Sequence, residues 1–344
     1  MNGLGTLALS RRTFLVNTAA LGAASLLATS RSHAAEPPPE TARIRLATAP
    51  VICTAPARLA EELLGVEGFT DIQYVNATEP GPAAITAGRA DLTQWGLFGT
   101  IPALDAADPV VLLAGVHAGC QELFADERIR QVRDLKGKRI AVSALGNEDH
   151  ISISCILAYV GIDPRTDVTW IPGGIRETVT RESPAMQLFI AGKTDAFMAF
   201  EPEPQDLRRR RIGHPIVSMV EDKPWSQYFC CTVAANRDFV RVNPVATKRA
   251  LRAILKAADL CANEPERAAR YIVEKGYEQR YEVALATVKT LPYRRWRDAN
   301  PEDTLRFFAL RLHEVGMLKS TPQKLIAQGT DWRFLNELKK ELKG

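Results

Sequence analysis

The sequence has no acidic residue before Glu36, although Asp and Glu number 40 among its 344 residues. Beyond the N-terminal segment it also lacks any apolar run near the roughly 20 residues that a membrane-spanning helix requires. No G-x-S-x-G elbow, phosphate-binding loop, G-x-G-x-x-G trio or H-E-x-x-H pair occurs. These absences argue against an integral membrane protein and against the hydrolases, nucleotide-binding proteins and zinc peptidases that carry those motifs.

The acid-free N-terminal segment has the order of an export signal. Arg11 and Arg12 precede a weakly apolar stretch over residues 16–28, and residues 32–34 offer the small-residue pattern that signal peptidases cut. The run "SRRTFL" resembles the twin-arginine export motif. We therefore predict a signal peptide over residues 1–34; the alternative is an N-terminal amphipathic helix.

Cleavage after Ala34 would leave a nearly neutral protein. It removes three of the 44 basic residues and no acid, which leaves 41 basic residues against 40 acidic ones. Such a balance gives no electrostatic footprint for nucleic acid or an anionic membrane. No cysteine lies near the cut, so a lipid anchor is not expected, and we predict a free periplasmic protein and a monomer.

The six cysteines show no spacing that dictates a disulfide or a metal site. Cys230 and Cys231 lie in "QYFCCTVAA", which reads as a buried strand in which cysteines serve as small core residues. The four histidines that remain after cleavage are far apart, and no ligand spacing links them to the cysteines. The sequence therefore predicts no metal and no cofactor.

A duplicated pattern predicts the fold. "RIRLATA" from Arg43 is echoed by "RIAVSAL" 96 residues later, "DIQYV" from Asp71 by "DVTWI" 96 residues later, and "AGRAD" from Ala87 by "AGKTD" 104 residues later. Each unit reads strand, helix, strand, helix, strand, which favours an α/β fold of two doubly wound lobes with a central cleft. Beyond about residue 235 the pattern turns helical, with Asn243 and Asn300 as predicted helix caps.

We predict five segments from these patterns: the signal peptide over residues 1–34, a disordered lead-in over 35–42, the first part of lobe 1 over 43–118, lobe 2 over 119–228, and over 229–344 a return to lobe 1 followed by the C-terminal helices.

Ligands of parallel α/β sheets bind beyond the carboxyl ends of the strands, so the residues that follow each strand are the candidate site. Trp95 could stack on a ligand or simply cover the end of its sheet. Arg176 could pair an anion or form an exposed salt bridge. Glu201 could accept hydrogen bonds from an amine or orient an arginine. The acids Glu148 and Asp149 are interpreted as partners of a helix dipole, with Asn147 as the cap.

"VRDLKGKRIAVSALGNEDH" and "AGKTDAFMAFEPEP" resemble segments of periplasmic solute-binding proteins of ABC importers, in the nitrate, sulfonate and taurine group that is related to thiamine-pyrimidine-precursor binders. The resemblance implies the type II periplasmic-binding fold, with a hinge that closes on a small-molecule solute. It also implies two partners, an inner-membrane permease and its cytoplasmic ATPase. With Arg176 from the strand ends, the expected ligand-binding residues are Val51, Ile52, Cys53, Gln94, Trp95, Gly146, Asn147, His150 and Glu201.

Two other functions stay open. Pyrimidine synthases related to these binders are enzymes that use a lysine-bound pyridoxal phosphate and a cysteine-rich iron motif, of which "FCC" at residues 229–231 is only a fragment. A periplasmic sensor would share the fold. We expect a binding protein and not an enzyme. Because Glu148 and Asp149 disfavour a small bare anion such as nitrate, we expect an organic solute.

Overall fold

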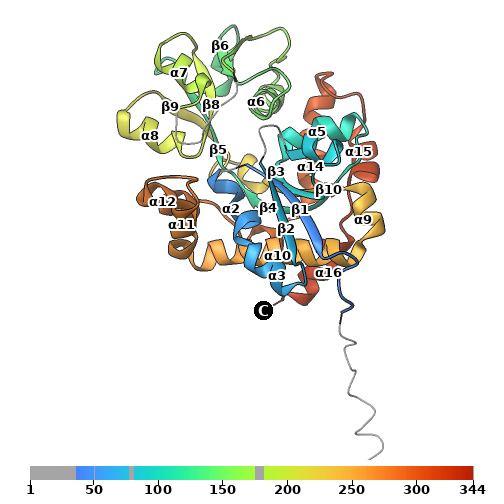
Figure 1. Cartoon of the computed structure of the whole chain (residues 1–344). Coiled ribbons are helices and arrows are strands. Elements are labelled where there is room, and N and C mark those ends of the chain that lie inside the picture. Colours follow the sequence, from blue (N-terminus) through green and yellow to red (C-terminus); the bar gives the residue numbers. More distant parts are fainter. Residues whose placement is uncertain (1–35, 50, 77–80, 175–181, 344) are drawn as a thin grey trace, which may run out of the picture. The chain divides into compact units, whose positions relative to one another are not determined.

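The computed structural model describes residues 36–49, 51–76, 81–174 and 182–343. The predicted signal peptide and Arg176 lie outside the described residues. From Pro39 onward the chain clusters as one unit, which contains two five-stranded sheets with helices packed on them (Figure 1). Within the described ranges, every helix is too short or too polar to span a bilayer.

The first sheet has the strand order β2-β1-β3-β10-β4. Its strands are β1 (Arg43–Thr48), β2 (Asp71–Asn76), β3 (Leu92–Gly96), β4 (Val110–Ala118) and β10 (Phe229–Asn236). β1 pairs in parallel with β2 and β3, whereas β10 is antiparallel to β3 and β4.

The second sheet has the equivalent order β7-β6-β8-β5-β9. Its strands are β5 (Gln121–Ala125), β6 (Arg139–Val142), β7 (Thr169–Pro172), β8 (Ala196–Phe200) and β9 (His214–Ser218). β6 is parallel to β7 and β8, and β5 is antiparallel to β8 and β9. The predicted duplication and the two-lobed α/β fold are therefore confirmed. The chain passes between the sheets twice, from β4 to β5 and from β9 to β10.

One of the three predicted echoes is two residues out of register. Arg45, and not Arg43, is the counterpart of Arg139, because each donates its backbone N–H and guanidinium to one aspartate, Asp91 or Asp195. The guanidinium nitrogens lie 2.6 Å and 2.8 Å from these carboxylates. The repeated Arg–Asp pair ties the first strand of each lobe to the turn before its third strand, so it fixes which arginines correspond.

Helices connect most of the strands of both sheets, and more helices follow the last strand, β10. Those before β10 are η1 (Ile52–Thr54), α2 (Ala55–Leu59), α3 (Glu61–Val66), α4 (Gly81–Thr86), α5 (Leu97–Asp105), η2 (Val132–Leu135), α6 (Glu148–Tyr159), α7 (Pro184–Ile190), α8 (Glu203–Arg210) and η3 (Trp225–Gln227). Those after it are α9 (Arg237–Val242), α10 (Pro244–Asn263), α11 (Pro265–Glu274), α12 (Tyr281–Thr290), α13 (Arg295–Asp298), α14 (Pro301–Glu314), α15 (Pro322–Gly329) and α16 (Arg333–Glu341).

The C-terminal helices pack mainly, but not only, on the first sheet. α10 contacts α2, α3, α16 and β4, whereas α14 contacts α6 of the second lobe. One hydrophobic cluster contains residues of α5, α6 and α14 together with residues of both sheets. The two lobes therefore share apolar packing at this place.

The predicted helix caps have different outcomes. Asn300 caps α14 as expected, since its side chain accepts a hydrogen bond from the backbone N–H of Glu302. Asn243 precedes α10 but makes no capping bond with its side chain. Glu40 replaces it, because its carboxylate accepts hydrogen bonds from the N–H groups of Val245 and Ala246, at 2.9 Å and 2.8 Å. Glu40 belongs to the predicted disordered lead-in, whose residues 36–42 form no helix or strand.

Candidate functional site

Gln94 holds the loop that follows β1 against β3. The amide of this fully buried side chain accepts a hydrogen bond from the N–H of Ala57 at 2.9 Å and donates one to the carbonyl of Cys53 at 3.0 Å. The structure thus brings two predicted site residues, Gln94 and Cys53, together. Because both ends of its amide are engaged within the protein, Gln94 positions this loop.

His117 is a second support for the same loop. It is fully buried on β4, with Nε2 3.1 Å from the carbonyl oxygen of Cys53 and Nδ1 3.1 Å from that of Ala118. The hydroxyl of Tyr293, whose ring lies edge-on to His117, donates to the carbonyl of Ile52 at 3.3 Å. Burial alone would lower the pKa of His117, but the neighbouring sulfur atoms, chiefly that of Cys231, raise it well above its ordinary value.

Four thiols gather beside His117. The Sγ atoms of Cys53, Cys120 and Cys231 all lie within 4.8 Å of one another. The Sγ atom of Cys230 lies 2.8 Å from that of Cys120. All six cysteines of the chain are free thiols in this structure. Cys230 and Cys231 belong to a buried strand as expected, but their convergence with Cys53 and Cys120 was not anticipated from the sequence.

Glu148 turns toward the first sheet from the start of α6. Its carboxyl accepts a hydrogen bond of 2.9 Å from Nε2 of Gln121, the first residue of β5. It also lies so close to Gly96, at the end of β3, that a Cβ there would come within 3.0 Å of three carboxyl atoms. Burial, with the nearby sulfur atoms of Cys231 and Cys53, raises the pKa of Glu148 well above its usual range.

The interpretation of Glu148 as a helix-dipole partner missed this contact. Asp149 carries out the local role instead, since it accepts hydrogen bonds from the backbone N–H and hydroxyl of Ser143 and from the N–H of His150. Asn147 stands at the N-cap position but makes no capping bond, and its amide donates to the Ser143 hydroxyl at 3.2 Å. The predicted cap is therefore wrong, because the Asp149 carboxylate is the group that binds the turn.

The amide oxygen of Gln121 has no hydrogen-bond donor among the described residues. The bond from Nε2 to Glu148 fixes the orientation of its amide, and the opposite atom, Oε1, is buried with no hydrogen-bond partner among the described residues. An unpaired buried carbonyl oxygen costs about 1–3 kcal/mol. The structure therefore joins a carboxyl to a side chain with an unsatisfied amide oxygen, and both groups can accept hydrogen bonds from a bound molecule.

Glu201 supplies a second buried carboxyl, at the end of β8. It is 8% exposed and accepts a hydrogen bond from the hydroxyl of Thr287, in α12, at 3.3 Å. Burial raises the pKa of Glu201 to about 7, against the lowering effect of hydrogen bonds from Gln205 and Thr287. The link to Thr287 joins the second lobe to the C-terminal helices.

The other predicted site residues lie at the same strand ends. The ring of Trp95 is partly buried, and its Cε3 and Nε1 atoms face Gly81 and Gly99, so it packs against α4 and α5. His150 accepts a hydrogen bond at Nδ1 from the N–H of Gly146 and lies edge-on to Trp170, while burial lowers the pKa of His150.

Val51 precedes η1, and its carbonyl accepts hydrogen bonds from the N–H and hydroxyl of Thr54. Ile52, the first residue of η1, is buried.

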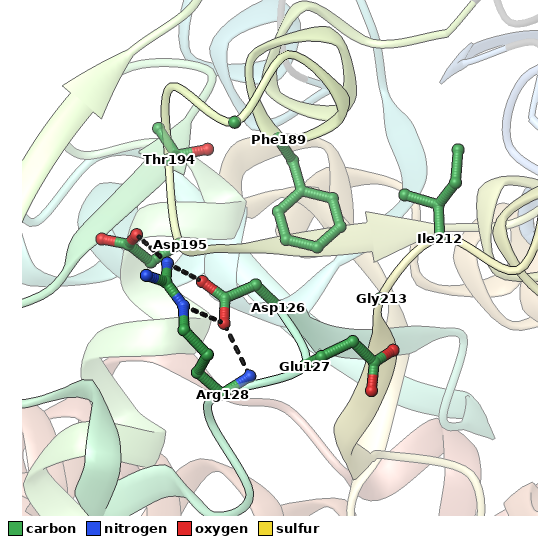
Figure 2. Close-up of a pocket in the computed structure, with 9 residues that line it drawn as sticks. Asp126, Glu127, Arg128, Phe189, Thr194, Asp195, Ile212 and Gly213 are labelled. Atoms are coloured by element: carbon green, nitrogen blue, oxygen red, sulfur yellow. Dashed lines mark hydrogen bonds and ion pairs between the residues drawn. The ribbon is translucent and has the colours of Figure 1, made fainter.

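Two surface hollows lie elsewhere. The larger, of about 340 Å³, is lined by residues that include Arg128, Phe189 and Ile212 (Figure 2). In Figure 2 the Arg128 guanidinium pairs with Asp126 and also reaches Asp195. Asp195 precedes β8, so this hollow lies at the amino end of that strand, away from the edge where Glu201 and Gln121 lie. The second, of about 230 Å³, lies beside Cys261 and Tyr293.

The arrangement of two equivalent sheets with a double crossing defines the fold of periplasmic binding proteins, and comparisons with solved structures agree. The alkanesulfonate-binding protein SsuA from Xanthomonas axonopodis pv. citri, bound to MOPS, has a TM-score of 0.66 with 18% identity over 85% of this chain and 99% of that chain. The nitrate-binding protein NrtA from Synechocystis PCC 6803 has a TM-score of 0.70 with 15% identity over 89% and 90%.

An enzyme shares the fold. The desulfurization enzyme DSZB has a TM-score of 0.59 with 16% identity over 87% of this chain and 99% of that chain. No curated protein sequence matches this chain. The profile of the NMT1/THI5-like family matches residues 70–268, and the chain belongs to that family.

Proposed function

We propose that this protein is the solute-binding component of an ABC importer and that its solute is a small organic molecule bearing hydrogen-bond donors, such as an amine or an amino-heterocycle. The observation that carries the choice of solute is the Gln121–Glu148 pair, with its buried, unpaired Oε1 beside a carboxyl. Such a pair is satisfied by N–H groups, and its unpaired amide oxygen has no proton to donate to a bare anion.

The position of this pair supports capture between the lobes. Glu148 belongs to the second lobe and lies against Gly96 of the first, and Gln121 begins the second sheet directly after the first crossing. A solute held here would contact both lobes, so its binding would favour the closed state by its extra contacts in that state. Glu201 offers a further acceptor at the same strand edge.

The test is a thermal-shift and calorimetric panel on the mature chain, with an aminopyrimidine, a primary amine, an alkanesulfonate and nitrate as ligands. The proposal expects stabilisation by a donor-bearing compound and a loss of that stabilisation in Glu148→Gln. Glu127→Gln, an exposed carboxylate of the hollow in Figure 2, is the matched control. Stabilisation by nitrate or sulfonate alone would refute the choice of solute.

Delivery to a permease and its ATPase, export to the periplasm and a monomeric state belong to the same proposal. Stimulation of a reconstituted permease and ATPase by the loaded protein would separate an importer component from a sensor. Replacing Arg11 and Arg12 by lysine should retain the protein inside the cell if the twin-arginine route is used. The proposal also holds that the protein is not an enzyme, and conversion of the solute to a new product would contradict this.

A further inference from the structure

Three of the sulfur atoms beside His117 come from segments far apart in the chain. Cys53 lies in η1 after β1, Cys120 lies in the crossing between β4 and β5, and Cys231 lies in β10 after the second crossing. The pairing of β10 with β4 is irregular on both sides of Cys231, and such irregularity redirects side chains within a strand. Three separate elements are therefore shaped so that their thiols meet.

The backbone of Cys120 is strained in this arrangement. Its φ is 106°, a value in the left-handed region that residues with a Cβ rarely adopt, and it directly follows Gly119 with φ 70°. Strain of this kind costs about 1–3 kcal/mol and is found where function demands a particular side-chain position. A cysteine that served only to fill the core would not require it.

The surroundings provide a site made of sulfur alone. Cys120 and Cys231 are each 2% exposed. Both ring nitrogens of His117 already face carbonyl oxygens, so the imidazole is not a free ligand. The Cys53 carbonyl is held by Gln94 and His117, which fixes the loop that carries the first thiol. Such outer contacts orient ligands at metal centres.

We propose that Cys53, Cys120 and Cys231 form a binding site for a soft cation, Zn²⁺ or Cu⁺, with Cys230 available as a fourth sulfur. Thiolates select these cations. With metal–sulfur bonds of about 2.3 Å, ligand sulfurs lie about 3.8–4.0 Å apart, so the three sulfurs, all within 4.8 Å of one another, need only small shifts to close around an ion. The Cys230 sulfur lies 2.8 Å from that of Cys120 and would have to turn away from it to serve as a fourth ligand. The bound ion would tie the first crossing, β10 and the loop after β1 to one another.

The experiment uses the reduced, metal-free mature chain. Zn²⁺ is titrated against a chromophoric chelator and Cu⁺ against bicinchoninate in separate arms, and Co²⁺ substitution reports sulfur ligation by its charge-transfer absorption. The expected result is one tight equivalent of Zn²⁺ or Cu⁺, with loss of that stoichiometric binding in Cys53→Ser and in Cys231→Ser.

Cys155→Ser is the matched control, because Cys155 is also a buried free thiol but belongs to α6 and lies outside the cluster. Circular dichroism and unfolding of each variant identify any that fail to fold. For such a variant, Co²⁺ absorption and thiol protection from alkylation in the unmodified chain decide the question. Absence of tight binding by the reduced chain overturns the proposal. Tight binding that is unchanged in Cys231→Ser also overturns it. A third contradicting result is a protein that contains a Cys120–Cys230 disulfide and that binds neither Zn²⁺ nor Cu⁺ after the disulfide is reduced.

Discussion

The contact between Gly96 and Glu148 makes a quantitative prediction for Gly96→Ala. Gly96 has φ −62° and ψ 137°, which alanine adopts without strain, so the backbone conformation does not disfavour the substitution. The new Cβ would instead overlap the Glu148 carboxyl, which must then move away. That movement breaks the hydrogen bond from Gln121 and leaves its buried amide nitrogen with only the weak acceptor Sγ of Cys230, 3.6 Å away. The expected loss is about 2 kcal/mol in the free energy of unfolding.

The assay is a double-mutant cycle measured by urea unfolding. In a Glu148→Ala background the carboxyl is absent, so Gly96→Ala should cost less than about 0.5 kcal/mol, and the coupling between the two sites should be about 2 kcal/mol. Equal costs of Gly96→Ala in the two backgrounds would refute the reasoning. The start of α6 would then not lie against the end of β3, and the predicted solute site would lose its closing wall.

The remaining predictions concern groups whose partners are equally well defined. Because the pKa of Glu201 is raised to about 7 from 4.5, the folded state binds its proton more tightly than the unfolded state. Stability should therefore fall by roughly 3 kcal/mol between pH 4.5 and 7 through this group. In Glu201→Gln this slope should vanish, and an unchanged pH profile of unfolding would contradict the assignment. Asp91→Ala and Asp195→Ala should each cost about 2 kcal/mol, since each removes a buried carboxylate that accepts hydrogen bonds from an arginine backbone N–H and guanidinium. Asp71→Ala, which removes an exposed pair, should cost under about 0.5 kcal/mol by the same denaturant assay; similar costs for all three would disprove the distinction. Glu40→Ala should lower stability by about 1 kcal/mol through loss of a helix cap, and no change would show that the cap is not used in solution.

The two-lobed fold could be predicted because strands, turns and glycines repeat locally in the sequence. The sequence repeat aligned β1 with β6 two residues out of register. The pairing of Arg45 with Asp91 spans 46 residues, so only the folded sheet reveals that Arg45 is the counterpart of Arg139. The cap at Asn300 follows from neighbouring residues and was correct. The cap of α10 was missed because Glu40 comes from 206 residues away, beyond the reach of a local rule.

In the candidate site, too, local patterns predicted the positions of some residues but not the contacts between distant segments. The strand-end rule predicted the places of Gln94 and Trp95 in β3 and of Glu201 directly after β8. The contact of Glu148 with Gly96 could not be predicted from its position in the first turn of a helix. The helix dipole already explains an acid at that position, so nothing local indicates that its side chain points toward β3. The gathering of Cys53, Cys120 and Cys231 depends on two crossings and on a positive φ in a residue that is not glycine, and no spacing rule contains either.

Mass spectrometry of the compound bound to the mature chain tests the central claim most directly. The protein is loaded with the donor-bearing solute identified from the panel, incubated at growth temperature and then denatured to release it. The account predicts one solute per chain, recovered with its mass unchanged, and reduced occupancy in Glu148→Gln. Release of a chemically altered compound, or occupancy that is indifferent to Glu148, would contradict it.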